Sequence, residues 1–319
     1  MNHSSTTPHD ETQSGKLILP ADTDLDVWRK ARMSGIGASE IGAVMGLNPY
    51  RSALKVWLTK TGREAEFEGN AKTRWGSRQE ALICDDFAEQ TGKTLRETGL
   101  WQSNYLRWEI ATPDRLIESP FNELVEAKNV GPYSAHHWDC GVPSYCYAQV
   151  QQQLDVTGRT RGYVAAAIAG DPPRVWAIDR DEEFIDRIRE AGERFWWHVE
   201  TDTTPPVGDA PVPDIAKAHP TQPGTEIELD FEAEVLHATY VDARAVETEA
   251  GKRKKEAGRQ LRPLMGTAQR GILGGREAVT ITTPKPRKKI DEERLAKEDP
   301  DIYNKYLIEV PVSPQMNIK

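Results

Sequence analysis

The chain has 319 residues, of which 38% are hydrophobic and 29% charged, and its formal net charge is −9. No run approaches the roughly 18 apolar residues of a membrane-spanning helix, which argues against an integral membrane protein. The three cysteines, at positions 84, 140 and 146, have no CxxC spacing and are too few for a four-cysteine iron–sulfur cluster, which fits the reducing cytoplasm.

Composition divides the chain into four segments. Residues 1–20 are polar and have no apolar h-region, so we expect a disordered leader and not a secretory signal. Residues 21–200 mix helical and strand patterns, which predicts an α/β domain with a mixed central β-sheet flanked by helices. Residues 201–224 are rich in Pro and Thr and are expected to be a linker. Residues 225–319 are expected to form a helical extension with a small β segment.

Hydrophobic spacing predicts the elements of the second segment in chain order. The two earliest are helices over 51–61 and 75–90, each followed by a glycine that ends it. The others are strands over 108–112 and 123–130, a helix over 145–156, strands over 161–169 and 174–178, and a helix over 181–200.

The strand predicted over 123–130 carries two opposite charges on one face. Side chains alternate along a strand, so Glu126 and Lys128 point the same way. A buried carboxylate or ammonium group is costly unless it is paired or bound to a metal ion. An ion pair on an edge strand is the simpler alternative.

A second carboxylate precedes this strand. Asp114 follows Pro113 at a strand end, and a hairpin at this point would bring Asp114 and Glu126 together. Two close carboxylates repel each other unless a divalent cation lies between them. Mg²⁺ is held in this way by one or two carboxylates, water and substrate phosphate, and Lys128 can then steady a water or the developing phosphate charge.

These residues resemble a known signature. Pro113-Asp114 with Glu126-Ala127-Lys128 looks like the PD-(D/E)xK nuclease motif. The stretches SGIGASEIGAVMGLNPYRSALKVW (34–57), RWGSRQEALICDDFAEQTG (74–92) and YAQVQQQLDVTG (147–158) follow the order of the YqaJ-like viral recombinase family, which is similar to phage lambda exonuclease. The resemblance spans about residues 26–200 and implies a restriction-endonuclease-like core.

The resemblance also implies an activity. Members of the family are alkaline exonucleases that degrade linear double-stranded DNA 5′→3′ with Mg²⁺, for which Mn²⁺ can substitute, and often act beside a single-strand annealing protein. Lambda-type relatives form rings, so a trimer or tetramer in the cytoplasm of a bacterial host is expected. A DNA-binding recombination scaffold with a vestigial site, and an endonuclease on the same core, are the alternatives.

The resemblance assigns metal ligation to Asp114, Glu126, the carbonyl of Ala127 and nearby Glu80, and water positioning to Lys128. Helix periodicity gives independent evidence on Glu80. The residue shares a helix face with apolar residues at 83, 84 and 87, so it points toward the core and needs a partner. A charge that answers the helix dipole is the simpler alternative.

The segment GIGASE (35–40) is expected to hold a phosphate. It is not a nucleotide loop, because no strand precedes it and no Gly-Lys-Ser/Thr follows. Backbone N–H groups and the Ser39 hydroxyl at a helix start can bind an anion, although Ser39 can also simply cap the helix. By resemblance, Arg32 and Ser39 match residues that hold the 5′-terminal phosphate of DNA.

The helix over 145–156 contains four glutamines in five positions. By resemblance one of them lies beside the active site, and Gln149 is the better match, with Gln151 as the alternative. RecB-type nucleases would carry a tyrosine where this chain has Gln153, which leaves the lambda-type enzymes as the closer kin. A polar helix face is the simpler reading.

The last segment begins with a helix expected over 231–264. Two basic runs, KRKK (252–255) and KPRKK (285–289), suggest an arm that contacts DNA or a partner, and a spacer or oligomerisation arm is an equal alternative. A small β pair is expected from residues 279–283 and 306–312.

Overall fold

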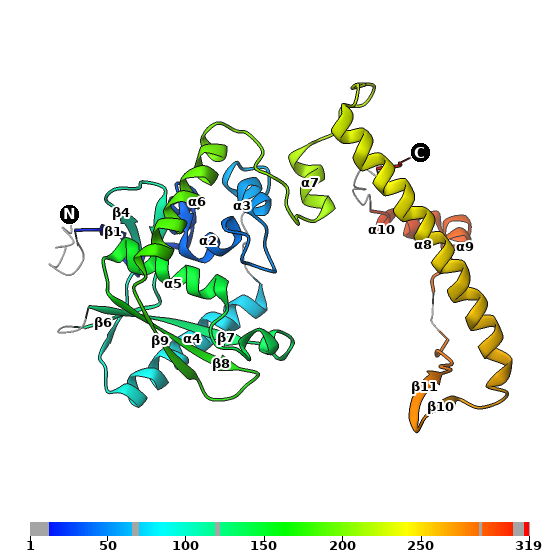
Figure 1. Cartoon of the computed structure of the whole chain (residues 1–319), viewed down its shortest axis with the longest axis horizontal. Coiled ribbons are helices and arrows are strands. Elements are labelled where there is room, and N and C mark those ends of the chain that lie inside the picture. Colours follow the sequence, from blue (N-terminus) through cyan, green and yellow to red (C-terminus); the bar gives the residue numbers. More distant parts are fainter. Residues whose placement is uncertain (1–12, 66–69, 119–121, 287–288, 309–315, 319) are drawn as a thin grey trace. The chain divides into compact units, whose positions relative to one another are not determined.

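The computed structural model describes residues 13–65, 70–118, 122–286, 289–308 and 316–318. The chain divides into two compact units, Met1–Pro220 and Thr221–Lys319, called here the N-terminal and C-terminal units (Figure 1). None of the helices in the described ranges combines the length and apolar character that crossing a bilayer requires.

All eight elements expected from hydrophobic spacing are present in the N-terminal unit, together with others that the sequence did not predict. In chain order they are β1 (Gly15–Leu19), α1 (Leu25–Arg32), β2 (Ile36–Gly37), α2 (Ala38–Val44), α3 (Ala53–Lys60), α4 (Ala71–Thr91), β3 (Leu95–Arg96), β4 (Leu100–Ser103), β5 (Glu109–Ala111), β6 (Arg115–Ile117), β7 (Glu123–Val130), the 3₁₀ helix η1 (Pro132–Trp138), α5 (Ser144–Thr157), β8 (Arg161–Ile168), β9 (Arg174–Asp179), α6 (Glu182–Glu200) and α7 (Val212–Ala218).

The strands form two mixed sheets. The larger sheet has the order β3-β6-β7-β8-β9, in which β7 and β8 pair in parallel along their whole length and the other neighbours are antiparallel. The smaller sheet has the order β1-β4-β5-β2, with β2 and β5 parallel. The mixed α/β fold predicted from the sequence is confirmed, with its sheet divided into two.

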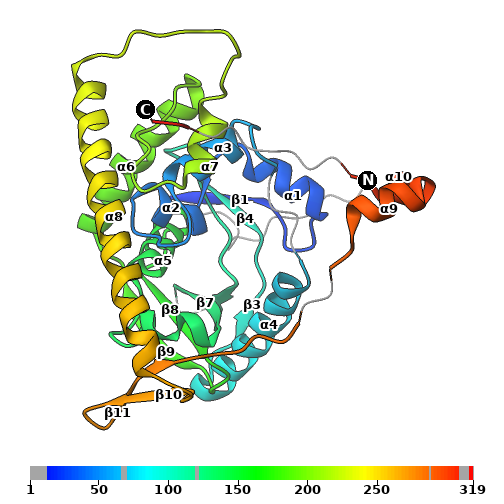
Figure 2. The same cartoon turned by 90° about the vertical axis from the view of Figure 1, so that its right-hand side faces the viewer.

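Helices cover both faces of the larger sheet. Leu124 of β7 packs with Val150 and Leu154 of α5, whereas Val125 packs with Phe87 of α4. Figure 2 shows α5 and α4 on opposite sides of β7 and β8. Since β7 is covered on both sides, the charges of its central residues are held inside the protein, and the edge-strand reading does not apply.

Helix α5 is unusual because it buries amide side chains. Gln152 is fully buried, and its Nε2 donates to the carbonyls of Ile36 in β2 and Ile110 in β5, at 2.8 and 3.0 Å. Because a buried amide needs such partners, Gln152 fixes how α5 lies against β2 and β5 of the smaller sheet.

Two segments differ from expectation. Residues 1–20 were expected to be a disordered leader, but β1 pairs antiparallel with β4; residues 1–12 lie outside the described ranges. The expected linker over 201–224 contains α7, whose Asp214 is buried and accepts from Lys55 Nζ at 3.2 Å. Both segments gain their order from partners far away in the sequence, which local composition does not reveal.

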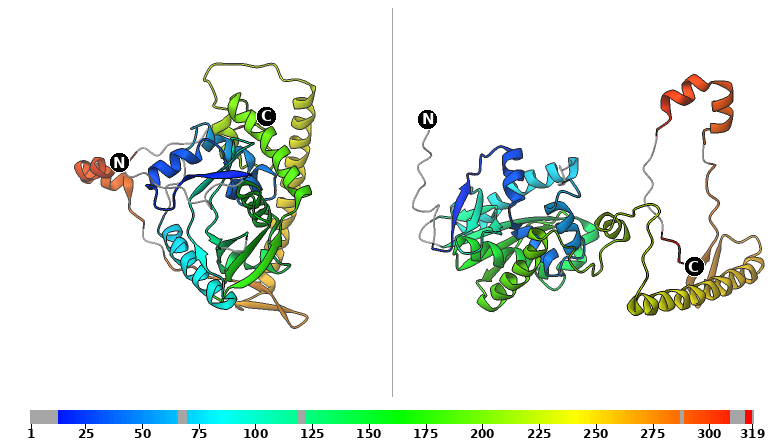
Figure 3. Two further views of the ribbon diagram at one scale, coloured as in Figure 1. Left: turned by 90° about the vertical axis from the view of Figure 1, so that its left-hand side faces the viewer. Right: turned by 90° about the horizontal axis from the view of Figure 1, so that it is seen from above.

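The C-terminal unit is built mainly from one long helix (Figure 3). Its elements are α8 (Phe231–Leu264), β10 (Arg270–Leu273), β11 (Arg276–Thr280), α9 (Glu292–Glu298) and α10 (Pro300–Tyr306). The helix over 231–264 is confirmed.

The β pair of this unit was placed wrongly by the sequence. Strands β10 and β11 pair with each other around Gly274 and Gly275, whose φ angles of 57° and 78° suit a tight hairpin turn. Residue 306 instead ends α10, and residues 309–312 of the expected second strand lie outside the described ranges, as do 287–288 of the KPRKK run.

Candidate active site

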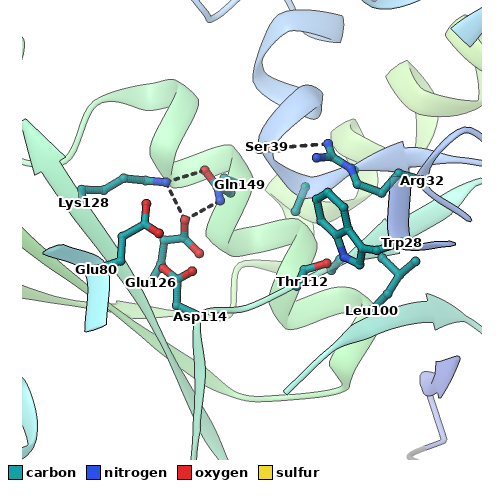
Figure 4. Close-up of a pocket in the computed structure, with 13 residues that line it drawn as sticks. Trp28, Arg32, Ser39, Glu80, Leu100, Thr112, Asp114, Glu126, Lys128 and Gln149 are labelled. Carbon is teal, nitrogen blue, oxygen red and sulfur yellow. Dashed lines mark hydrogen bonds and ion pairs between the residues drawn. The ribbon is translucent and has the colours of Figure 1, made fainter. Parts of the chain in front are cut away.

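The hairpin of β6 and β7 brings the two expected carboxylates together. Asp114 directly precedes β6, whose first residue, Arg115, pairs with Val125. The Asp114 carboxylate therefore reaches β7, where its Oδ2 accepts a hydrogen bond from the Ala127 backbone N–H at 2.7 Å. Asp114 and Glu126 face one shared pocket, together with Glu80, Lys128 and Gln149 (Figure 4).

Glu126 is held by donors on both carboxylate oxygens. Its Oε1 accepts from Lys128 Nζ at 2.5 Å and from Gln149 Nε2 at 2.6 Å, and its Oε2 accepts from Gln153 Nε2 at 2.7 Å. The residue is 4% exposed. Fixed donors on both oxygens hold the orientation of this buried carboxylate.

The structure separates the roles of the glutamines. Gln149 lies in the site and also accepts from Lys128 Nζ at 3.0 Å. Gln151 faces the junction of β9 and α6, where it donates to the Asp179 carbonyl and accepts from the Asp181 N–H. Of the two alternatives, Gln149 is the glutamine of the site. Gln153, which the sequence reading set aside, is the second clamp on Glu126.

Glu80 enters the pocket from α4, as expected from its helix face. Ile83, Cys84 and Phe87 on the same face are buried. No hydrogen bond joins the Glu80 carboxylate to the described residues, and burial together with the nearby charge of Glu126 raises its pKa, against the attraction of Lys128. A partly buried acid without a donor is poised to accept a cation or a proton.

The other charges of the pocket are shifted in the same sense. Burial and the charge of Glu126 raise the pKa of Asp114 well above its usual value. Burial is the largest influence on Lys128 and by itself would lower its pKa, but Glu126, Cys146 and Asp114 together outweigh burial and the pKa is raised. Lys128 is therefore a permanent cation, and one lysine does not balance three carboxylates.

The donor set fits a hard divalent cation. Within the described ranges, no three His, Cys, Asp or Glu side chains converge closely enough to form a metal centre by themselves. Mg²⁺ does not need such a cage, since one or two carboxylates complete its shell with water and substrate phosphate. Asp114, Glu126 and the Ala127 carbonyl are suitable oxygen donors, and Glu80 lines the same pocket.

The opposite wall of the pocket is cationic and aromatic. The cavity, of about 350 Å³, is also lined by Trp28, Arg32 and Ser39. The Arg32 guanidinium lies 4.8 Å from the Trp28 ring centroid and donates to Ser39 Oγ at 3.4 Å. Figure 4 shows this group facing the carboxylates across the pocket. An anion held by Arg32 would thus lie beside the carboxylate cluster.

Arg32 is held in place by an ion pair with the buried carboxylate of Glu40. This carboxylate lies 2.7 Å from Lys60, 3.3 Å from Arg51 and 3.6 Å from Arg32. Burial opposes its charge, but the three cations lower its pKa to about 2. Gly37 allows this approach, because a Cβ there would lie 2.8 Å from the Arg32 guanidinium.

One family model matches the part of the chain that carries this site. Residues 27–160 match the model of the YqaJ-like viral recombinase domain. This part of the chain is therefore similar to the YqaJ-like viral recombinase domain. The match includes Arg32, Glu80, Asp114, Lys128 and Gln149.

Two relatives align with the chain. The uncharacterized protein YqaJ of Bacillus subtilis is 27% identical over 299 residues, which cover 91% of this chain and 92% of that protein. The uncharacterized protein R354 of Acanthamoeba polyphaga mimivirus is 27% identical over 143 residues, 41% of this chain and 26% of that protein. The similarity to the Bacillus protein thus extends beyond the YqaJ-like domain.

Two solved structures are also similar. The alkaline exonuclease LHK-Exo of Laribacter hongkongensis has 21% identity and a TM-score of 0.49, covering 56% of this chain and 93% of that one. A phage-related exonuclease of Haemophilus somnus has 14% identity and a TM-score of 0.41, covering 53% and 96%.

Sequence reasoning missed two residues of this site, Trp28 and Gln153, and left the role of Ser39 open. Trp28 had a signal, because it lies four residues before Arg32 on one helix and so shares its face. Gln153 had none, because its place depends on how α5 packs on β7. Ser39 was weighed as the helix cap, but α2 begins at Ala38 with Gly37 as its N-cap, so the Ser39 hydroxyl is left for Arg32.

Proposed function

We propose that this protein is a divalent-metal-dependent exonuclease of the phage recombination type, which hydrolyses phosphodiester bonds of linear double-stranded DNA from its 5′ ends. The observation that carries the proposal is one pocket in which Asp114, Glu126 and Lys128 face Arg32 and Ser39. Cleavage that starts at a DNA end needs carboxylates that bind a metal ion and a guanidinium group that binds the terminal phosphate.

A magnesium ion, when bound, would polarise the scissile phosphate and supply an activated water. Asp114, Glu126 and the Ala127 carbonyl would hold it, with Glu80 close by. Mn²⁺ has the same preference for oxygen ligands and should substitute. The raised pKa values of Asp114 and Glu80 support this proposal, because excess negative charge in the pocket favours a cation.

Lys128 acts in this proposal as a fixed positive charge. Its raised pKa excludes service as a general base near neutral pH. The ammonium group of Lys128 donates hydrogen bonds to Glu126 at 2.5 Å and to Gln149 at 3.0 Å, and these two acceptors fix its position in the pocket. A positioned cation of this kind stabilises charge that develops on the phosphate in the transition state.

Arg32 and Ser39 would bind the terminal 5′-phosphate. The guanidinium offers two N–H groups to one phosphate, and its Trp28 and Glu40 contacts hold the fork in place. The Trp28 ring offers a stacking face to a base at the end of the duplex. Anchoring at the terminus would make digestion begin at an end.

The test compares linear and covalently closed circular duplexes of one sequence, with 5′-phosphate or 5′-hydroxyl ends, with Mg²⁺ or with EDTA. We expect nucleotide release only from linear DNA with Mg²⁺, faster from 5′-phosphorylated ends, with Mn²⁺ as an active replacement. Duplexes blocked by phosphorothioates on the 5′ or the 3′ side establish the polarity.

A matched pair of variants makes this test specific. Lys128→Ala should abolish digestion, whereas Lys93→Ala should leave it unchanged, because Lys93 pairs with Glu123 at the other end of the same strand, outside the pocket. Parental digestion by Lys128→Ala would refute the assignment. DNA binding without cleavage would indicate a scaffold, and cleavage of circles an endonuclease.

We also propose that the protein works as a ring-shaped trimer or tetramer beside a single-strand annealing protein. Support comes from the YqaJ-like domain and from the role that the 3′ single strand left by such digestion would play in annealing. Light scattering of the full chain tests the oligomer, and a mass below that of a trimer would contradict it.

A further inference from the structure

Helix α8 is long and has no core of its own. Its 34 residues span about 51 Å, and none of them is buried in the described structure. Leu236, Val246 and Leu264 are 63%, 66% and 82% exposed. Most helices owe their stability to an apolar face packed against a partner. A helix of this length with exposed aliphatic side chains therefore needs a surface to cover them.

Part of the apolar surface of α8 follows the repeat of a coiled coil, whereas Phe231, Val235, Val241 and Val246 lie off it. Nine positions spaced alternately by four and three residues lie along one stripe. In order they are Leu236, Tyr240, Ala243, Glu247, Ala250, Lys254, Ala257, Leu261 and Leu264. Seven of the nine are apolar, and the three alanines allow a second helix to approach closely at the centre. The stripe thus fits another helix.

The charges of α8 are divided between its halves. Residues 231–247 contain four acidic residues and one arginine, a net charge of −3, whereas residues 248–264 contain six basic and two acidic residues, a net charge of +4. Two copies side by side in parallel would place like charges together. Two antiparallel copies place each acidic half against a basic half.

The stripe itself is self-complementary about Ala250. In an antiparallel pair that crosses there, residues whose numbers sum to about 500 lie at the same height. The resulting partners are Leu236 with Leu264, Tyr240 with Leu261, Ala243 with Ala257, Glu247 with Lys254, and Ala250 with itself. The two charged positions of the stripe therefore meet as an ion pair, whereas parallel packing would set Glu247 against Glu247. A single polar pair of this kind specifies register.

We propose that α8 pairs with the α8 of a second copy of this chain, as an antiparallel two-helix coiled coil crossing at Ala250. The apolar stripe supplies the contact, and the opposed charges of the halves set the orientation. The occupant is another copy because the surface complements itself end to end. The KRKK run then serves chiefly to match the acidic half of the partner. This inference is independent of the proposed nuclease activity.

Cysteine crosslinking of the full chain tests the crossing point. The background is Cys140→Ser, since Cys140 is the exposed native cysteine and the other two are buried. Ala250→Cys should give a disulfide-linked dimer on mild oxidation, because a residue at the crossing meets its own copy. Ala245→Cys is the matched control and should stay uncrosslinked, because it lies on the opposite side of the helix.

Charge reversal tests the orientation. In the Ala250→Cys chain, Glu247→Lys should remove most of the crosslinked dimer, and so should Lys254→Glu, because each sets two like charges together. Combining both reversals should restore the dimer to the starting yield. Glu249→Lys makes the same charge change off the stripe and should have a much smaller effect. Light scattering should show the mass falling by half in each single variant, from two rings joined through α8 to one ring, and recovering in the double variant.

Three results would overturn the inference. Absence of crosslinking by Ala250→Cys would mean that another surface, of this chain or of another protein, covers the stripe. Crosslinking that requires added DNA would make DNA the organising partner. Self-crosslinking of Leu236→Cys would indicate parallel helices, since the antiparallel pair sets this residue opposite Leu264. Nuclease activity can be present or absent in each case, so failure of one proposal is distinguishable from failure of the other.

Discussion

Replacing Glu40 by glutamine should destabilise the N-terminal unit and loosen the proposed phosphate site. Glu40 is 2% exposed and is the shared partner of three cations. Glutamine keeps the shape and removes the charge. Lys60, whose side chain is 1% exposed, would then be a buried ammonium group without a carboxylate. Removing one partner of a buried ion pair costs about 3–5 kcal/mol.

The pKa of Glu40 gives an independent magnitude. Its fall from 4.5 to about 2 corresponds to about 3 kcal/mol of stabilisation of the charged form, at 1.36 kcal/mol per pH unit. Because the folded pKa is lowered, this stability is complete above pH 4.5 and is lost as the pH falls toward 2. The parent and Glu40→Gln should therefore differ by about 3 kcal/mol at pH 7 and by only about 1 kcal/mol at pH 3.

Urea unfolding followed by tryptophan fluorescence is the assay. All nine tryptophans precede residue 200, so the signal reports on the N-terminal unit alone. Glu190→Gln is the control, since Glu190 is exposed and its ion pair with Arg194 spans 3.7 Å at the surface. That variant should change stability by less than about 0.5 kcal/mol. An unfolding curve of Glu40→Gln that coincides with the parent at pH 7, or a gap that stays constant down to pH 3, would refute the reasoning.

Two further predictions concern other buried polar groups. Glu109 is 1% exposed, neither of its oxygens is hydrogen-bonded to the described residues, and burial with the nearby Asp155 raises its pKa. A carboxyl group whose pKa is raised in the folded state lowers the stability of the protein as the pH rises above 4.5. Glu109→Gln should therefore raise the unfolding free energy at pH 8 by about 1–3 kcal/mol and leave it nearly unchanged at pH 4. Equal gains at both pH values would contradict this. Gln153→Leu removes the donor to Glu126 Oε2 and should raise the Mg²⁺ concentration for half-maximal cleavage about 10–100-fold, whereas Gln151→Leu should lower stability without that shift.

The sequence by itself determined the local features of this protein. Alternation along β7 put Glu126 and Lys128 on one face, and the structure places both in one pocket. Glycines mark helix ends because they accept positive φ, as Gly158 does at 66° after α5. Helix α8 was predicted over its whole length because its pattern is a property of the local sequence. Each of these inferences uses residues within one or two turns of each other.

Only the tertiary structure decided which polar side chains meet. Gln149 and Gln153 clamp Glu126 while Gln151 faces β9, although all three lie on one helix, because the packing of α5 against β7 sets their directions. The cations around Glu40 come from α1, α3 and the loop before α3, and β1 and α7 are ordered by partners more than 80 residues away. Periodicity reports which face of an element is buried. The partner that a buried charge finds there depends on chain segments that only folding brings together.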